Sequence, residues 1–273
     1  MPITADFHMH SSHSGDGNTP VEQMIQEAVR SGMTQICFTE HQDFDYPESP
    51  EIPPDFFLLN TDAYLRDLIG CQTKYAGSIR VGFGVELGLQ PHLAQIHTRY
   101  IRSFDFDFVI ASSHVCHGQD PYYPAFYQSR SEEEAYRDYF SSILENLRLF
   151  QDFDVYGHLD YVVRYGPDKD THYTYQTYQD IFDQILMLLL EKGKGLELNT
   201  GGLKHGLREP NPCSAVLKRY RSLGGEIITV GSDAHVPESI GSSFARAEDI
   251  LKECGFSYYT TFHHRVPEYH KLT

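Results

Sequence analysis

Nine side chains with metal-binding donor atoms lie at the ends of predicted β-strands or just beyond them. His8 and His10 are two positions apart at the end of the first predicted strand, so both imidazoles point to the same face. A set of imidazole and carboxylate ligands suits divalent ions such as Zn, Mn or Fe. The predicted metal ligands are His8, His10, Asp16, His41, Glu86, His114, His158, Asp233 and His235.

The elements that must position these side chains alternate between short apolar runs and amphipathic helices. Strands are predicted over 5–10, 35–40, 79–85, 106–112, 155–158, 195–199 and 227–231, with a further run over 258–262. Helices are predicted over 20–31, 131–147, 178–192 and 211–220, and weaker patterns cover 61–75, 91–101 and 244–254. This alternation predicts an α/β fold with a parallel (β/α) barrel, and an open doubly wound sheet is the alternative. In a barrel the carboxyl ends of the strands meet at one face, which would bring the nine donors together.

Composition and charge exclude several classes of function. The chain has 22 basic and 38 acidic residues, a net charge of −16, which disfavours binding to nucleic acid or to an anionic membrane. The longest apolar run, 185–190, is far too short to cross a bilayer. The five cysteines show no CxxC spacing and the N-terminal residues show no signal-peptide pattern, so we expect a cytoplasmic protein.

Six short motifs contain eight of the nine donors and resemble those of the polymerase and histidinol phosphatase (PHP) superfamily. The motifs are DFHMH (6–10), TEH (39–41), GVE (84–86), SH (113–114), GHLD (157–160) and SDAH (232–235). Within this superfamily the sequence is most similar to the PHP-type histidinol-phosphatases. The resemblance implies a distorted (β/α)7 barrel, and we predict a single PHP domain over residues 1–273.

The resemblance also implies three divalent metal ions and a ligand set for each. The first ion would take His8, His10, Glu86 and Asp233. Glu86 would bridge to a second ion that also takes His114 and His158. The third ion would be held by Asp16, His41 and His235.

The implied chemistry is hydrolysis of a phosphate monoester by a hydroxide that bridges metal ions. We predict that Arg164 clamps the phosphate, although an ordinary surface arginine is the alternative. Asp233, His235 and His117 are candidates for protonating the leaving group. Asp43, in the acidic loop after the second strand, would meet a cationic group on the substrate, or that loop is simply solvated. The predicted catalytic residues are Asp233, His235 and Arg164, and the predicted substrate contacts are Arg164, His117, Asp43 and His205.

These features predict a phosphatase that converts L-histidinol phosphate to L-histidinol and phosphate in histidine biosynthesis. The alternatives are another small phosphate ester, a nucleotide or a phosphodiester as substrate, or a non-catalytic PHP module. No nucleic-acid or membrane partner is expected, and the oligomeric state cannot be deduced. His92 and His97 lie on a predicted helix away from the strand ends, so both are expected at the surface.

Overall fold

Seven parallel strands form the central sheet, in the order in which they occur along the chain. The structure, a computed structural model, describes residues 3–48 and 52–273. Each strand pairs in parallel with the next one. The strands are β1 (Ala5–Asp6), β2 (Gln35–Gln42), β3 (Arg80–Gly88), β4 (Phe108–Ser112), β5 (Val155–Tyr156), β6 (Gly195–Asn199) and β7 (Ile228–Gly231).

Hydrogen bonds between the first and last strands close this sheet into a barrel. The Phe7 N–H donates to the Val230 carbonyl at 3.0 Å, and the Asp233 N–H donates to the His8 carbonyl at 2.8 Å. These bonds confirm the predicted barrel over the open doubly wound sheet. β1 and β5 are only two residues long, so the barrel is distorted. The ladder of β1 ends at Asp6, earlier than the predicted strand over 5–10, and the following residues continue beside the end of β7 through a single Met9–Ala234 bridge.

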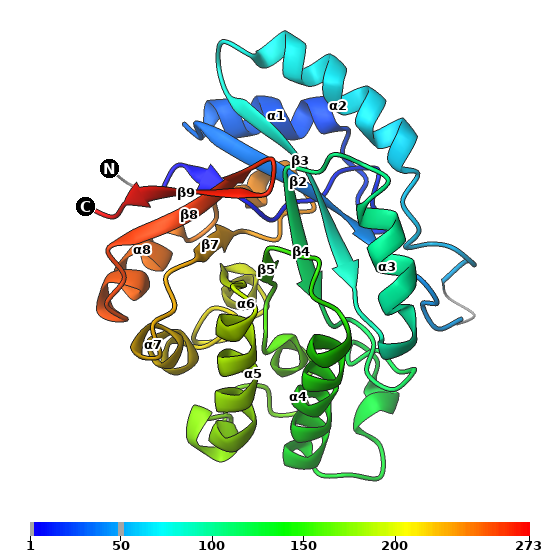
Figure 1. Cartoon of the computed structure of the whole chain (residues 1–273), viewed down its shortest axis with the longest axis vertical. Coiled ribbons are helices and arrows are strands. Elements are labelled where there is room, and N and C mark those ends of the chain that lie inside the picture. Colours follow the sequence, from blue (N-terminus) through cyan, green and yellow to red (C-terminus); the bar gives the residue numbers. More distant parts are fainter. Residues whose placement is uncertain (1–2, 49–51) are drawn as a thin grey trace.

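The helices surround the sheet (Figure 1). The α4 helix shows how local sequence sets a boundary, because Ser131 and Glu134 form a capping box at its first turn. Among the described residues, no helix is long and apolar enough to span a membrane. The α-helices are α1 (Val21–Arg30), α2 (Thr61–Tyr75), α3 (Ala94–Ile101), α4 (Glu132–Leu149), α5 (Gln179–Glu191), α6 (Gly201–Lys204), α7 (Ser214–Ser222) and α8 (Phe244–Glu253), and the 3₁₀ helices are η1 (Pro91–Leu93), η2 (Pro124–Tyr127), η3 (Tyr161–Arg164), η4 (Tyr175–Tyr178) and η5 (Pro237–Ser239).

The predicted eighth strand is present but lies outside the barrel. β8 (Tyr258–His263) pairs antiparallel with β9 (Val266–Lys271), and the hairpin lies beside β7 (Figure 1). Direct bonding of β1 to β7 leaves no barrel edge for β8 to join. Instead, the ring of Phe262 stacks on Phe108 at 5.0 Å, and the Arg265 N–H donates to the Asp107 carbonyl, so the hairpin packs where the strands begin.

One buried carboxylate ties the closing strands together. Asp6, at the end of β1, accepts hydrogen bonds from the Ser232 hydroxyl (2.5 Å), the Ser232 N–H (3.0 Å) and the Gly241 N–H (3.0 Å). Ser232 follows β7 directly, so Asp6 bonds across the seam of the barrel, which is the junction between β1 and β7. The Asp6 side chain is fully buried. If it were removed, the Ser232 and Gly241 groups that donate to it would lose their acceptor.

We therefore expect Asp6→Ala to lower the free energy of unfolding by about 3 kcal/mol, because it leaves buried donors without an acceptor. In thermal denaturation, this corresponds to a Tm decrease of roughly 6–12 °C. Asp249→Ala, which removes an exposed carboxylate from α8, is the matched control and should change stability by less than about 0.5 kcal/mol. Equal Tm values for the two variants would contradict the role of Asp6.

Candidate metal centre

The structure brings all nine predicted donors together at the carboxyl ends of the barrel strands. His41 and Glu86 lie near the ends of β2 and β3, and the other donors lie in the segments that follow β1, β4, β5 and β7. His8, His10, Glu86 and His158 are almost completely excluded from solvent. Ligands that are far apart in sequence therefore share one small volume. Their roles as metal ligands remain predictions.

Glu86 lies at the centre of the cluster and contacts most of the histidines. Its Oε2 atom is 3.2 Å from His8 Nε2, 3.5 Å from His10 Nε2 and 3.1 Å from His41 Nδ1. Its Oε1 atom is 3.2 Å from His114 Nε2 and 2.8 Å from His158 Nε2. One carboxylate can therefore bridge two neighbouring groups of imidazoles.

The remaining two carboxylates complete the groups on either side. Asp233 Oδ1 lies 3.7 Å from His8 Nε2 and 3.6 Å from His10 Nε2. Asp16 Oδ2 lies 3.6 Å from His41 Nε2 and 3.2 Å from His235 Nε2. Sets of three donors from this cluster lie within 4.8 Å of one another, close enough for the donors of each set to bind one ion.

Unsatisfied atoms in the cluster show that the residues fit a group of cations. Among the described residues, none forms a hydrogen bond with His8 Nε2, His10 Nε2, His41 Nδ1, Glu86 Oε2 or His235 Nε2, although all five atoms are buried. Buried polar atoms are rarely left in this state, because their desolvation is not compensated. Divalent ions bound among these atoms would satisfy all of them.

Hydrogen bonds around the cluster orient the histidines. The Nδ1 atoms of His8 and His114 donate to the carboxylates of Glu197 (2.7 Å) and Asp43 (2.8 Å). Such bonds fix the tautomer, so each Nε2 lone pair is directed into the cluster.

His10 and His235 are oriented in the same way by weaker acceptors. His10 Nδ1 lies 3.1 Å from the Ser14 hydroxyl, which itself donates to Glu40 and so must accept from the ring. His235 Nδ1 donates to the Asp233 carbonyl at 3.1 Å.

The local electrostatics keep Glu86 ionised and shift the pKa values of the histidines in opposite directions. Burial raises the pKa of Glu86, but His8, His114 and His41 outweigh it and hold this pKa well below its ordinary value. Burial, together with the nearby His235 and His41, lowers the pKa of His10 well below its ordinary value. An ionised Glu86 and a neutral His10 are protonation states that bind metal. For His8, burial lowers the pKa, but Glu197 and Glu86 outweigh it and raise this pKa well above its ordinary value, so an ion bound there would displace a proton.

Sequence reasoning did not assign a role to Glu197, which is a central supporting residue. Glu197 lies on β6 and bonds to His8 Nδ1 and to the His158 N–H (2.8 Å). Gly231 leaves room for this contact, since a Cβ atom there would lie 2.4 Å from Glu197 Oε1. The sequence did contain a signal for this role, because Glu197 and Asn199 are two positions apart on a predicted strand. This spacing directs both side chains to the same face of the strand.

Arg164 is buried beside the cluster, so the alternative of an ordinary surface arginine is wrong. Its side chain is 3% exposed, and its guanidinium donates to Asp233 Oδ2 (2.7 Å), Asn199 Oδ1 (2.8 Å) and Asn211 Oδ1 (2.8 Å). Burial lowers its pKa, but Asp233 outweighs this effect and raises it, so the guanidinium stays charged. Its predicted role as a phosphate clamp remains a prediction.

A pocket of about 310 Å³ lies above the cluster, a size suited to a small ligand. Arg164 and His205 line it, as predicted for substrate contacts, and burial lowers the pKa of His205 to about 4. The pocket also contains residues that the sequence did not single out as ligand contacts. These are Tyr46, Phe57, Asp120, Tyr161, Tyr165, Gly201 and Lys204.

Two predicted substrate contacts are placed differently by the structure. Asp43 lines the pocket, but its Oδ2 accepts the hydrogen bond from His114, and Oδ1 faces Gly88, where a Cβ atom would approach it to 2.4 Å. Asp43 therefore orients a predicted ligand. His117 does not line this pocket, because its left-handed backbone (φ 50°) directs the half-exposed ring toward Asp138, 3.4 Å away.

Of the two helix histidines that were expected at the surface, one lies there and the other does not. His92 is exposed and lies 3.0 Å from Asp45, which confirms the expectation. His97 is completely buried between Phe44 and Phe150, so that expectation was wrong. The reason is that the His97 face of α3 packs against loops from neighbouring units, which periodicity within the helix does not show.

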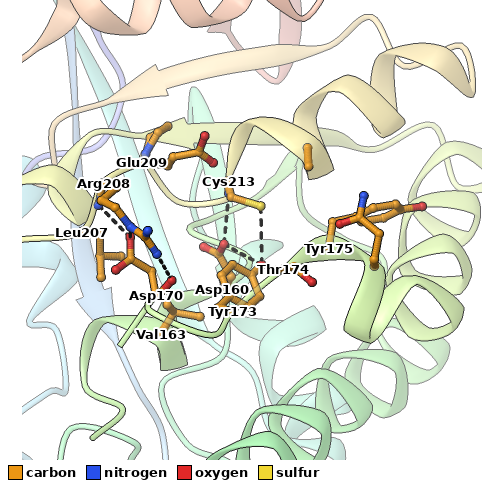
Figure 2. Close-up of a pocket in the computed structure, with 13 residues that line it drawn as sticks. Asp160, Val163, Asp170, Tyr173, Thr174, Tyr175, Leu207, Arg208, Glu209 and Cys213 are labelled. Carbon is orange, nitrogen blue, oxygen red and sulfur yellow. Dashed lines mark hydrogen bonds and ion pairs between the residues drawn. The ribbon is translucent and has the colours of Figure 1, made fainter. Parts of the chain in front are cut away.

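A second cavity of about 320 Å³ is lined by Asp160, Tyr173 and Cys213, among other residues (Figure 2). Its wall includes Asp160, which accepts hydrogen bonds from the Tyr173 hydroxyl and the Cys213 N–H. Asn211 donates to Asp160 and accepts from Arg164, so a buried polar chain joins this wall to Asp233. None of the nine donors lines this second cavity.

Comparison with known proteins identifies the family. The model of the PHP domain family matches residues 6–201. The chain belongs to the PHP domain family. The match runs from the end of β1 through β6 and leaves residues 1–5 and 202–273 outside, so the single domain over 1–273 remains a prediction.

Relatives of this PHP protein include proteins of similar length, one of them with a crystal structure. Histidinol-phosphatase from Lactococcus lactis subsp. lactis is 33% identical over 258 residues, covering 94% of this chain and 93% of the relative. A Clostridium acetobutylicum protein named "Probable histidinol-phosphatase" is 30% identical over 91% of this chain and 93% of its own length. The crystal structure of the Lactococcus lactis histidinol phosphate phosphatase, complexed with Zn, L-histidinol and phosphate, superposes with a TM-score of 0.88 at 32% identity, covering 97% of this chain and 98% of the other.

We expect His8→Ala and Glu86→Ala to lose bound metal, because each removes a donor from the middle of the cluster. Elemental analysis of the purified variants, compared with the parent protein, measures this loss. Added Zn²⁺ or Mn²⁺ should also raise the Tm of the chelated parent protein and not that of Glu86→Ala, since binding to the folded state stabilises it.

His92→Ala is the control for these two variants, because this exposed histidine contacts Asp45 and lies outside the cluster. It should keep the metal content of the parent protein. Full metal occupancy in Glu86→Ala would show that Glu86 is not the bridging ligand.

Proposed function

We propose that this PHP protein is a metal-dependent phosphomonoesterase that hydrolyses L-histidinol phosphate to L-histidinol and phosphate. The observation that carries the proposal is the set of buried, unsatisfied donor atoms that face one another at the floor of a small-molecule pocket. The likeness to the Lactococcus lactis enzyme, which binds Zn, L-histidinol and phosphate, supports the substrate. Such an enzyme belongs to histidine biosynthesis.

The proposed cofactors are divalent metal ions held by the nine donors. His8, His10, Glu86 and Asp233 would hold one ion, Glu86, His114 and His158 a second, and Asp16, His41 and His235 a third. When bound, such ions polarise a phosphoryl oxygen and lower the pKa of water. They would also explain how a protein of net charge −16 can bind an anionic substrate, because the positive ions set the electrostatic field in the pocket.

Residues of the chain itself would bind and orient the phosphate. The charged, planar guanidinium of Arg164 lies at the pocket wall, and its geometry suits parallel N–H donation to two phosphate oxygens. Lys204 lines the same pocket and bonds only to the Ser239 hydroxyl among the described residues, so it has donors left for an anion. Among the candidates for protonating the leaving group, Asp233 and His235 face the pocket and His117 does not.

The pocket and the charge favour a small monoester over the alternatives. A diester within a long nucleic acid would need a basic surface, whereas the protein carries excess negative charge. A non-catalytic module would have no need for a complete donor set. We further propose a cytoplasmic location, which agrees with five cysteines that are all free.

Phosphate release from the metal-loaded protein tests the proposed substrate. We expect kcat/KM for L-histidinol phosphate to exceed that for a mononucleotide and for bis(p-nitrophenyl) phosphate by at least about 100-fold, a difference of about 3 kcal/mol in transition-state binding. Treatment with a chelator should abolish the release, and added Zn²⁺ or Mn²⁺ should restore it. Equal rates on the monoester and the diester would remove the substrate assignment.

Arg164→Lys tests the phosphate clamp. Lysine keeps the charge, but its single ammonium group cannot replace the guanidinium. It cannot make all three bonds to Asp233, Asn199 and Asn211 and also offer phosphate two parallel donors. We expect kcat/KM for L-histidinol phosphate to fall by about 100-fold, with bound metal unchanged by elemental analysis. Arg208→Lys changes an arginine that bonds to Asp170 at the second cavity (Figure 2) and should leave kcat/KM within about twofold. Comparable losses in both variants would contradict a specific role for Arg164.

A further inference from the structure

Two adjacent histidines and one aspartate form a further group of metal-binding donors, separate from the nine described above. His263 ends β8, His264 begins the turn into β9, and Asp107 lies directly before β4. One donor atom from each residue lies within 4.8 Å of the other two. His114 follows the opposite end of β4, and the five residues of this strand span about 16 Å. The group therefore lies at the end of the barrel where the strands begin, away from the candidate metal centre.

The separations between the donor atoms suit a shared ion. Asp107 Oδ1 is 3.1 Å from His263 Nδ1 and 3.3 Å from His264 Nδ1. Hydrogen bonds from N–H to oxygen seldom exceed about 3.2 Å, so the second contact is long for such a bond. Two ligands that are each about 2.1 Å from a tetrahedral ion lie about 3.4 Å apart. An ion between these three residues would thus need little rearrangement of the carboxylate and the two rings.

The hairpin turn directs both imidazoles to the same oxygen. Adjacent residues of a regular strand point to opposite faces. Here His264 (φ 49°) and Arg265 (φ 66°) have left-handed backbone, as in a type I′ turn, and the centroids of the two histidine rings are 4.0 Å apart. The turn is anchored to Asp107, whose Oδ1 accepts from the His264 N–H (3.0 Å) and whose carbonyl accepts from the Arg265 N–H (2.9 Å). The donors are therefore preorganised although the two rings are exposed.

Asp107 supplies a charge that the neighbouring arginine does not neutralise. Its side chain is 11% exposed, and Oδ2 accepts from the Phe83 N–H at 3.0 Å, which fixes the carboxylate in place. The guanidinium of Arg265 is directed elsewhere, to Asp154 (2.5 Å) and Asp152 (3.4 Å). A cation at the turn would consequently meet a fixed, negatively charged ligand.

We propose that Asp107, His263 and His264 bind one divalent transition-metal ion of the Zn²⁺ class. Two imidazoles and a carboxylate suit Zn²⁺, Ni²⁺ or Cu²⁺, whereas Mg²⁺ and Ca²⁺ prefer sites built of oxygen ligands. Water would complete the coordination, since the three protein ligands leave a tetrahedral position open to solvent. The ion would join the β8–β9 turn to the start of β4, so this is a structural site and is independent of the proposed phosphatase activity.

Zinc titration of the chelated protein, followed by calorimetry, tests the proposal. The parent protein is expected to bind one more Zn²⁺ than His264→Asn, whatever number of ions the nine-donor centre takes. Asparagine tolerates the left-handed backbone of residue 264 and does not replace the imidazole as a ligand, so the variant should fold. His92→Asn removes an exposed histidine beside Asp45 and is the matched control, which should bind as many ions as the parent protein.

Equal zinc stoichiometry in the parent protein and in His264→Asn would overturn the proposal. So would a loss in His92→Asn as large as that in His264→Asn, because it would show that Zn²⁺ binds to exposed histidines without selection. Circular dichroism of each variant establishes that it is folded.

Hydrogen exchange determines where the further ion binds. Added Zn²⁺ should slow amide exchange within residues 258–271 of the parent protein, because the ion ties the turn to β4, and should not slow it in His264→Asn. Exchange in this hairpin that is unchanged by Zn²⁺, or slowed equally in both proteins, would contradict the site. Neither measurement depends on hydrolysis of a phosphate ester, so this proposal can fail or succeed separately from the proposed function.

Discussion

Closure of the barrel between β1 and β7 is the constraint on which the candidate centre depends. The bonds that join Phe7 to Val230 and His8 to Asp233 bring the first and last ligand segments side by side. Without them, His8 and His10 would lie at one edge of an open sheet and Asp233 and His235 at the other. The buried bonds of Asp6 hold this seam, so β1 closes the barrel and the segment that follows it supplies His8 and His10.

A second constraint is the burial of Glu86 among histidines. A carboxylate with no exposure to solvent is unfavourable unless positive charge surrounds it. The surrounding imidazoles are oriented from outside, by Glu197, Asp43 and Ser14, so that their free nitrogens face inward. The centre therefore consists of an inner set of donors and an outer set of acceptors that fixes their direction.

Sequence reasoning predicted the barrel and the convergence of the donors because both follow from patterns along the chain. Strand ends can be located from apolar runs, and parallel strands bring their ends to one face. What the sequence could not show is where a side chain turns after its strand has ended. His117 points to Asp138 because of a left-handed residue in a loop, and His97 is buried by segments distant in sequence. The role of Glu197 was missed for a related reason, since its partner His8 lies 189 positions away.

The spread of the donors from His8 to His235 has a consequence for the synthesis of the protein. Each group of donors combines residues that are separated along the chain, and the groups that contain Asp233 or His235 draw on both ends of that span. A nascent chain that has not yet reached His235 lacks part of the set and has no seam to close. A complete set of donors can therefore form only late, after translation has passed β7 and the barrel has closed.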